Sequence, residues 1–108
     1  MLLTTTGRKS GQPRTTALLF APDGGSFIVI GSNWGQQHHP AWSGNLLANP
    51  AATVMLNGEE IPVRAHLARD EERVRLRAKL LEVWPAYTAY EQRCEGRDLR
   101  IFRLERTG

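Results

Sequence analysis

Three permanent positive charges lie within seven residues near the start of the chain: Arg8, Lys9 and Arg14. They belong to segment 7–14, Gly-Arg-Lys-Ser-Gly-Gln-Pro-Arg, whose glycines let backbone N–H groups approach a ligand closely. Guanidinium groups offer forked donors to phosphate or carboxylate, and an ammonium offers a movable point charge. The segment lacks the Gly-Lys-Ser/Thr ending of a Walker loop. It therefore predicts either an anion-binding loop or a solvated basic turn between two strands.

The charge distribution separates this loop from the rest of the chain. The formal net charge is +3, and residues 1–22 carry three bases and no acid. Segment 24–58 contains no Asp, Glu, Lys or Arg, whereas eleven bases face ten acids from Glu59 onward. The neutral segment indicates either the centre of the core or the lining of a mostly neutral ligand cavity. A nucleic-acid-binding barrel spreads its bases along a groove, so we expect no nucleic acid and keep that class as a remote alternative.

Other chemistries find little support in the sequence. His38 and His39 are adjacent and diverge on any regular element, so no metal site is expected. Cys94 is the only cysteine, which excludes an internal disulfide and favours a reduced, cytoplasmic location. Ser32 does not stand in a Gly-x-Ser-x-Gly elbow, so a nucleophilic serine is not indicated.

Aromatic residues offer a second candidate surface. Trp84, Tyr87 and Tyr90 recur every three residues and would form a row on one helical face. Trp34 and Trp42 add flat side chains within the uncharged segment. Such rows are more typical of a core, although this set also fits a planar ring ligand with an anionic tail.

These residues need a scaffold of short strands. Hydrophobic patterning and turn signals predict strands at Leu2–Thr6, Thr15–Ala21, Phe27–Ile30, Ala52–Leu56, Glu60–Leu67 and Leu99–Leu104. Helices are predicted at Ala41–Ala48 and from Asp70 to about Trp84, the longer one with Val74, Ala78, Leu80 and Leu81 on its buried face. The first three strands are expected to form a meander, and Asn57-Gly58 a tight hairpin turn. The pattern predicts a mainly β domain with helices, an antiparallel six-strand barrel with one short and one longer helix.

One family resemblance covers nearly the whole chain. Segment 3–14, Leu-Thr-Thr-Thr-Gly-Arg-Lys-Ser-Gly-Gln-Pro-Arg, resembles the opening motif of the deazaflavin-dependent nitroreductases of actinobacteria, also described as F420H2-dependent quinone reductases. The similarity continues through Ile30-Gly31-Ser32-Asn33, Pro40-Ala41-Trp42, segment 45–50 and segment 85–90. The octapeptide together with Asn-Leu-x-Ala-Asn-Pro some thirty residues later is specific, whereas either motif alone is weak.

The resemblance implies a fold and a cofactor. The fold would be a split β-barrel like that of oxidoreductases that bind flavin mononucleotide (FMN), with residues 1–108 forming one domain. The cofactor would be coenzyme F420, whose phosphate and oligoglutamate tail are anionic. The residues implied for the tail are Arg8, Lys9, Ser10, Gln12, Pro13 and Arg14. Those implied for the ring are Gly31, Ser32, Asn33, Trp42 and Asn45.

The implied reaction is hydride transfer from the reduced deazaflavin to an electrophilic acceptor, namely a quinone, a nitroaromatic or an activated enone. By analogy with the family, Tyr87 is the first choice for the group that donates a hydrogen bond to the acceptor, with Ser32 or Tyr90 in support. An FMN-binding oxidoreductase on the same barrel, or an F420 carrier without turnover, is the alternative.

Family members usually carry a longer N-terminal stretch, in some cases a helix that covers the active site or touches the membrane. This chain starts at the Leu-Thr-Thr-Thr motif, so that extension is expected to be missing. No run approaches the roughly 18 apolar residues of a membrane span. We expect a cytoplasmic monomer or homodimer, with membrane association as the alternative.

Overall fold

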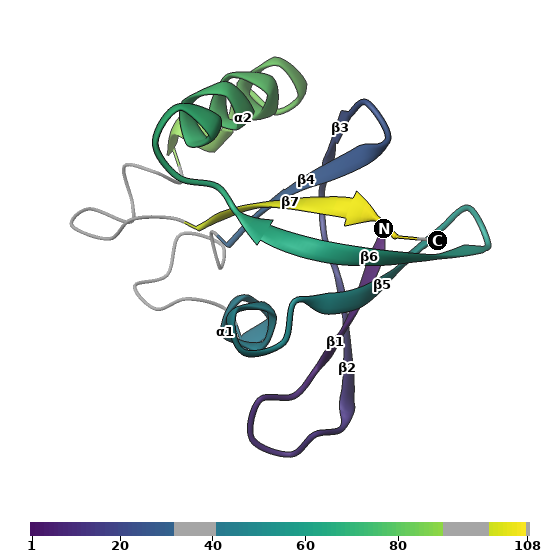
Figure 1. The fold of residues 1–108 in the computed structure, drawn as a ribbon. Coiled ribbons are helices and arrows are strands. Elements are labelled where there is room, and N and C mark those ends of the chain that lie inside the picture. The colour runs from purple at the N-terminus through teal and green to yellow at the C-terminus, as the bar shows by residue number, and fades with distance from the viewer. Residues whose placement is uncertain (32–40, 90–99, 108) are drawn as a thin grey trace.

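A computed structural model describes residues 1–31, 41–89 and 100–107 (Figure 1). In chain order its elements are β1 (Leu2–Thr6), β2 (Pro13–Ala17), β3 (Ala21–Asp23), β4 (Ser26–Ile30), α1 (Ala41–Ala48), β5 (Ala51–Leu56), β6 (Glu59–Leu67), α2 (Asp70–Val83) and β7 (Ile101–Arg106). All the strand pairs are antiparallel.

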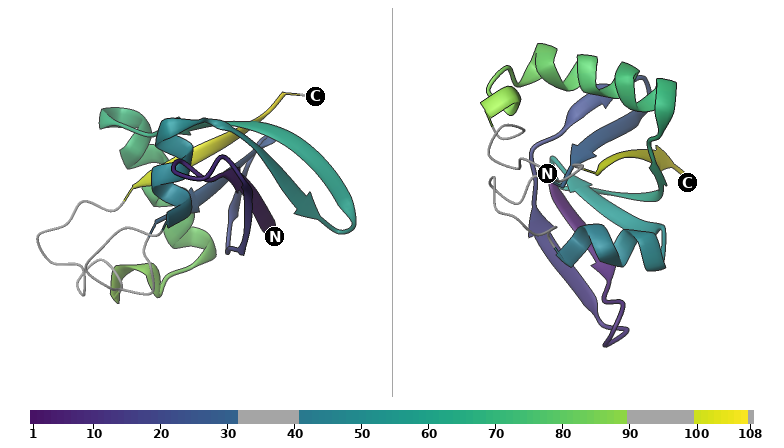
Figure 2. Two further views of the ribbon diagram at one scale, coloured as in Figure 1. Left: turned by 90° about the horizontal axis from the view of Figure 1, so that it is seen from below. Right: turned by 90° about the vertical axis from the view of Figure 1, so that its left-hand side faces the viewer.

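The sheet curls strongly, as its topology requires. The strand order is β2-β1-β5-β6-β7-β4-β3, so β2 and β3 are the two edges. Only Leu18–Phe20 separates these edge strands in the sequence, and a link of that length spans about 14 Å at most. The two edges must therefore lie close together, and the views in Figures 1 and 2 show the resulting open barrel. The predicted mainly β split-barrel architecture is confirmed.

The strand predicted at Thr15–Ala21 proves to be two strands, so the described residues form seven strands instead of the six predicted. Pro13–Ala17 pairs with β1, whereas Ala21–Asp23 pairs with β4 on the opposite edge. The meander is therefore wrong, because the chain crosses between edges at Leu18–Phe20 instead of folding back beside β2. The crossing segment is held by Leu18 and Phe20, which pack against the barrel core.

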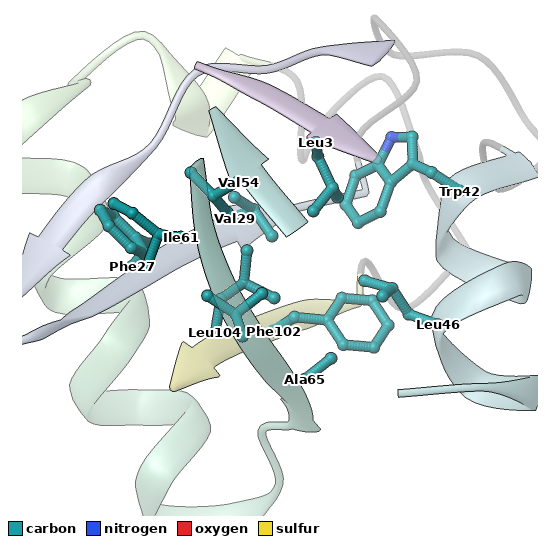
Figure 3. Packing of buried hydrophobic residues seen from close by; sticks show 11 residues of the cluster. Leu3, Phe27, Val29, Trp42, Leu46, Val54, Ile61, Ala65, Phe102 and Leu104 are labelled. Atoms are coloured by element: carbon teal, nitrogen blue, oxygen red, sulfur yellow. The ribbon is translucent and has the colours of Figure 1, made fainter. Parts of the chain in front are cut away.

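The barrel interior is filled by alternating strand residues and closed by α1. Figure 3 shows Leu3, Val54 and Phe102 converging from different strands, with Trp42 and Leu46 reaching in from α1. The ring centroids of Trp42 and Phe102 are 5.8 Å apart. The short helix predicted at Ala41–Ala48 is confirmed, and its apolar side chains anchor it to the barrel.

A second core lies between the sheet and α2. Phe27 and Val29 point into the barrel, whereas Ile28 and Ile30 contact the cluster formed with α2. Because β4 is buried on both faces, its sequence is a continuous apolar run rather than an alternating one. For this part of the neutral segment, the core interpretation is confirmed.

The predicted buried face of α2 is partly wrong. Val74 is 70% exposed and Ala78 is exposed, while the fully buried positions are Leu76 and Leu80. Leu76 and Leu80, one helical turn apart, face the sheet because two leucines bury more apolar surface than Val74 and Ala78 would. Arg75 and Lys79, one residue before each of these leucines, both reach Asp23 on β3 beside this buried face. The helix ends at Val83, close to the predicted end.

The hairpin predicted at Asn57-Gly58 is confirmed. Asn57 and Gly58 have φ of 53° and 79°, the left-handed conformation that a two-residue hairpin turn requires at both positions. The turn joins β5 to β6 in the register Leu56↔Glu59, which aligns the longest pair of strands in the sheet.

Candidate functional site

The basic loop between β1 and β2 is closed by its own hydrogen bonds. The N–H of Gly7 donates to the carbonyl oxygen of Gln12, and that of Gly11 to the carbonyl oxygen of Gly7, both at 2.8 Å. The N–H of Gln12 donates to Ser10 Oγ at 3.2 Å. A Cβ on Gly7 would lie 2.7 Å from Ser10 Oγ, and Gly11 has φ of 71°, so both positions favour glycine. The loop is therefore an ordered turn at the tip of the hairpin, which extends past α1 (Figure 1).

Arg8 connects this loop to α1. Its backbone N–H and its Nη1 donate to Asn45 Oδ1 at 3.1 and 3.2 Å, and Nη1 also donates to the carbonyl oxygen of Ala41 at 3.1 Å. The Asn45 amide in turn donates to Thr5 Oγ1 at 3.1 Å. Asn45 and Thr5 are 4% and 2% exposed. The two sequence motifs that carry the family resemblance are therefore in direct contact.

Gly44 leaves room for the Arg8 guanidinium because it has no side chain. A Cβ at position 44 would lie 2.9 Å from Arg8 Nη1 and 3.0 Å from Cζ. A glycine inside a helix costs about 1 kcal/mol relative to alanine, so its presence in an eight-residue helix signals a close approach. Neither Gly44 nor Thr5 is among the site residues predicted from the sequence. The helical glycine was a readable signal for Gly44, whereas Thr5 stands in a strand of similar threonines and offers none.

The loop keeps its positive charge. Within residues 1–31, 41–89 and 100–107, the ion pairs lie elsewhere and none involves Arg8, Lys9 or Arg14. The other residues implied for an anionic tail are exposed around them: Ser10, Gln12 and Pro13. Arg8 uses Nη1 for its side-chain contacts to α1. This arrangement suits phosphate or carboxylate, because charge-assisted donors stand on an ordered backbone without a competing carboxylate.

The residues expected near the deazaflavin ring lie in different surroundings, unlike the tail residues, which all belong to segment 7–14. Trp42 is 7% exposed and its side chain belongs to the barrel core, while Asn45 belongs to the hydrogen-bonded network under Arg8. Gly31 is buried at the end of β4 and donates its N–H to the carbonyl oxygen of Arg100 at 2.8 Å. The predictions for Ser32 and Asn33 lie outside the described residues.

Tyr87 is 0% exposed and packs with the second core. Its ring centroid lies 6.0 Å from that of Trp84, so the predicted contact at a spacing of three residues is present. The two residues do not share a face of α2, because the helix ends at Val83 and Trp84 already has non-helical φ and ψ as its C-cap. Tyr90 lies outside the described residues, as do Trp34, His38, His39 and Cys94.

Within the part of the chain that the structure describes, His, Cys, Asp and Glu side chains form no group of three that could hold a metal ion. In the same residues no helix combines the length and apolar character needed to cross a bilayer.

Comparison with known proteins gives consistent matches. The profile of the F420H(2)-dependent quinone reductase family matches residues 1–106. An F420H(2)-dependent quinone reductase of Mycobacterium tuberculosis is 40% identical over 65 residues, which cover 60% of this chain and 44% of that protein. The chain thus spans less than half the length of this curated relative.

Solved structures agree with these matches. An F420-H2 dependent reductase (FDR-A) superposes with a TM-score of 0.87 and 31% identity, covering 96% of this chain and 91% of that chain. A second structure with the same score and identity, covering 78% of its own chain, is described as a domain-swapped dimer. The haem storage protein HutZ of Vibrio cholerae, at 16% identity and a TM-score of 0.74, shares the fold alone. With its profile match over residues 1–106, the chain belongs to the F420H(2)-dependent quinone reductase family.

Proposed function

We propose that this protein transfers hydride from reduced coenzyme F420 to an electrophilic acceptor: a quinone, a nitroaromatic or an activated enone. Membership of the family supports the cofactor. The observation that carries the proposal is the ordered basic loop beside α1, where Arg8, Lys9 and Arg14 meet no carboxylate among the described residues.

The loop and α1 would both contribute to binding F420. Lys9 and Arg14 are exposed and would attract the anionic tail, with Ser10, Gln12 and the ring of Pro13 around it. Arg8 would contribute the guanidinium N–H groups that it does not use toward α1. Trp42 and Asn45 would keep α1 in place on the ring side, where Gly31, Ser32 and Asn33 complete the proposed set.

When bound, F420 would supply the hydride. The chain's part is to orient the acceptor and to donate a hydrogen bond where negative charge develops. Tyr87 is the proposed donor, supported by Ser32 or Tyr90. A tyrosine hydroxyl titrates near pH ~10 and is therefore protonated at neutral pH. Since Tyr87 is buried, the proposal requires that its hydroxyl become accessible when the acceptor binds.

Replacing Tyr87 by phenylalanine tests this role. We expect turnover to fall about tenfold or more while the Kd for F420 stays within a factor of about two, because only the hydroxyl is lost. Steady-state kinetics with a quinone and a nitroaromatic give the turnover, and fluorescence titration gives the Kd. Unchanged turnover with both acceptors would remove Tyr87 from the mechanism and leave it a core residue.

The function is tested first by titrating the protein with oxidised F420 and, separately, with FMN. We expect saturable fluorescence quenching with F420 and none with FMN. Oxidation of reduced F420 that depends on an added quinone or nitroaromatic would then separate an enzyme from a carrier. Binding of FMN alone would move the protein to the flavin-binding alternative, and binding of neither would contradict the proposal.

A homodimer is the assembly we propose, supported by the structural neighbour that is described as a domain-swapped dimer. Sedimentation velocity at micromolar concentration would measure it. We further propose a cytoplasmic location, since the one cysteine of the chain cannot form an internal disulfide.

A further inference from the structure

Arg100 joins the two stretches that flank residues 32–40. Its carbonyl oxygen accepts the N–H of Gly31 at 2.8 Å, directly after β4. Its Nη1 donates to Ser43 Oγ at 3.0 Å in the first turn of α1. Ser43 is 0% exposed, so this hydroxyl points inward to the arginine rather than to solvent. One residue therefore contacts both sides of the candidate site, through its backbone on one side and its side chain on the other.

The position of α1 depends on such contacts. A helix of eight residues is far too short to be stable by itself, so its place must come from tertiary interactions. Trp42 and Leu46 hold it to the barrel core, and Asn45 holds it to Arg8. The bond from Arg100 to Ser43 is a third attachment, and it comes from the opposite end of the sequence.

The hydrogen bond from Arg100 to Ser43 differs in chemistry from the contact that the neighbouring Arg103 makes. Arg103, three residues further along, pairs with Glu72 at 3.2 Å and so ties β7 to α2. Among the residues that the structure describes, Arg100 has no carboxylate partner within ion-pair distance. A permanently charged donor on a neutral, buried hydroxyl makes a directional bond, which defines the position of α1 relative to Gly31.

We propose that Arg100 is a positioning residue of the F420 site, acting through Ser43 to keep α1 in register with the end of β4. The inference rests on the proposed function, because it assigns the register of α1 a role in cofactor binding. Arg100 itself does not contact the cofactor in this proposal. Its effect on binding is therefore expected to pass entirely through the Ser43 hydroxyl.

A double-mutant cycle tests this. Arg100→Gln and Ser43→Ala are each expected to raise the Kd for oxidised F420 about five- to tenfold, and the double variant no more than the larger single effect. Arg100→Lys keeps a charged donor and should stay within about threefold of the parent. Arg103→Gln is the matched control on β7, expected within about twofold. Alanine has a higher helix propensity than serine. If residue 43 affected only the intrinsic stability of the helix, Ser43→Ala would therefore cause no loss of affinity for F420.

Either of two binding results would overturn the inference. An unchanged Kd in both single variants would show that the contact does not position the site. Effects that multiply in the double variant would show that Arg100 acts elsewhere, for instance directly on the cofactor.

Amide hydrogen exchange gives a second readout that needs no cofactor. Exchange in Ala41–Ala48 is expected to speed up at least about fivefold in Arg100→Gln and Ser43→Ala, with β5 and β6 unchanged. Unchanged exchange in α1 would overturn the inference. If the parent protein fails to bind F420 while α1 responds in this way, the proposed function fails and the positional role of Arg100 stands.

Discussion

Two corners of the molecule each fix a helix with an arginine, yet their chemistry differs. On the α1 side, Arg8 donates to neutral acceptors, the Asn45 amide and the backbone carbonyl of Ala41. On the α2 side, Asp23 at the end of β3 accepts from Arg75 at 3.0 and 3.2 Å and from Lys79 at 2.7 Å. The two corners lie on different sides of the sheet, as the right-hand view of Figure 2 shows for the helices.

The difference distinguishes a structural contact from the proposed ligand site. At the α2 corner a carboxylate takes up the donors, and the hydrogen bonds from Arg75 and then Lys79 lower the pKa of Asp23 to about 2. At the α1 corner the acceptors are neutral, so the full charge of Arg8 remains beside Lys9 and Arg14. An arginine that is fixed in position but not neutralised is preorganised for an anion. The following predictions test that contrast, beginning with the largest effect.

Asn45→Ala should be the most damaging change at the α1 corner. The variant removes the acceptor for the backbone and side chain of Arg8 and the donor to Thr5, all at a buried position. We expect a loss of about 2–3 kcal/mol in the free energy of unfolding. Urea denaturation measures it, with Asn49→Ala as control, since Asn49 is exposed and its side-chain Oδ1 accepts a local hydrogen bond from the N–H of Ala51. Equal losses in both variants would contradict the assignment of a network at Asn45.

Exchanging the arginines one at a time probes the contrast directly. Arg8→Gln is expected to raise the Kd for F420 about tenfold, or about 1.4 kcal/mol, since it removes an uncompensated cation from the site. Arg75→Gln, matched in chemistry, should leave the Kd within about twofold. Fluorescence titration measures both, at 50 and 300 mM salt. Equal effects would mean that net charge, rather than the α1 corner, attracts the cofactor.

Acid should weaken the α2 corner selectively. The folded pKa of Asp23, about 2, lies below its ordinary 3.8, so its stabilisation is present above about pH 4 and is lost as pH falls toward 2. The side chains of Arg75 and Lys79 are 49% and 40% exposed, so solvent screening limits the effect to about 1 kcal/mol.

In Asp23→Asn this component of the pH dependence should disappear, and the Kd for F420 at pH 7 should not change. Thermal unfolding followed between pH 2 and pH 6 gives the comparison. A pH profile identical to that of the parent would show that the cluster does not stabilise the fold.

Local sequence patterns predicted much of the scaffold correctly. The Asn57-Gly58 turn, the run Phe27–Ile30 and the helix over 41–48 follow from conformational preferences and periodicity, which act over a few residues. The break at Leu18–Phe20 was missed because its residues have ordinary strand propensity. What ends the pairing there is the closing of the sheet, a constraint that involves the whole chain.

The candidate site divides in the same way. The basic loop was evident from residue types, and so was the resemblance of the loop motif and of segment 45–50 to motifs of one family. Only the tertiary structure shows three further contacts. Arg8 donates to Asn45, Gly44 leaves room for the Arg8 guanidinium, and Arg100 donates to Ser43. These partners are 36 to 57 residues apart in the sequence, and no local sequence pattern predicts contacts between residues so far apart.

By itself, the sequence determined the composition of each part: a local excess of positive charge, a neutral middle, and strands that require a barrel. Only the tertiary structure decided which positively charged side chains pair with a carboxylate. Arg75 and Lys79 meet Asp23, whereas Arg8 meets an amide, because the curled sheet brings β3 beneath α2 and the β1–β2 loop against α1. Charge is a property of residues, but its compensation depends on which residues the fold brings within about 4 Å of one another.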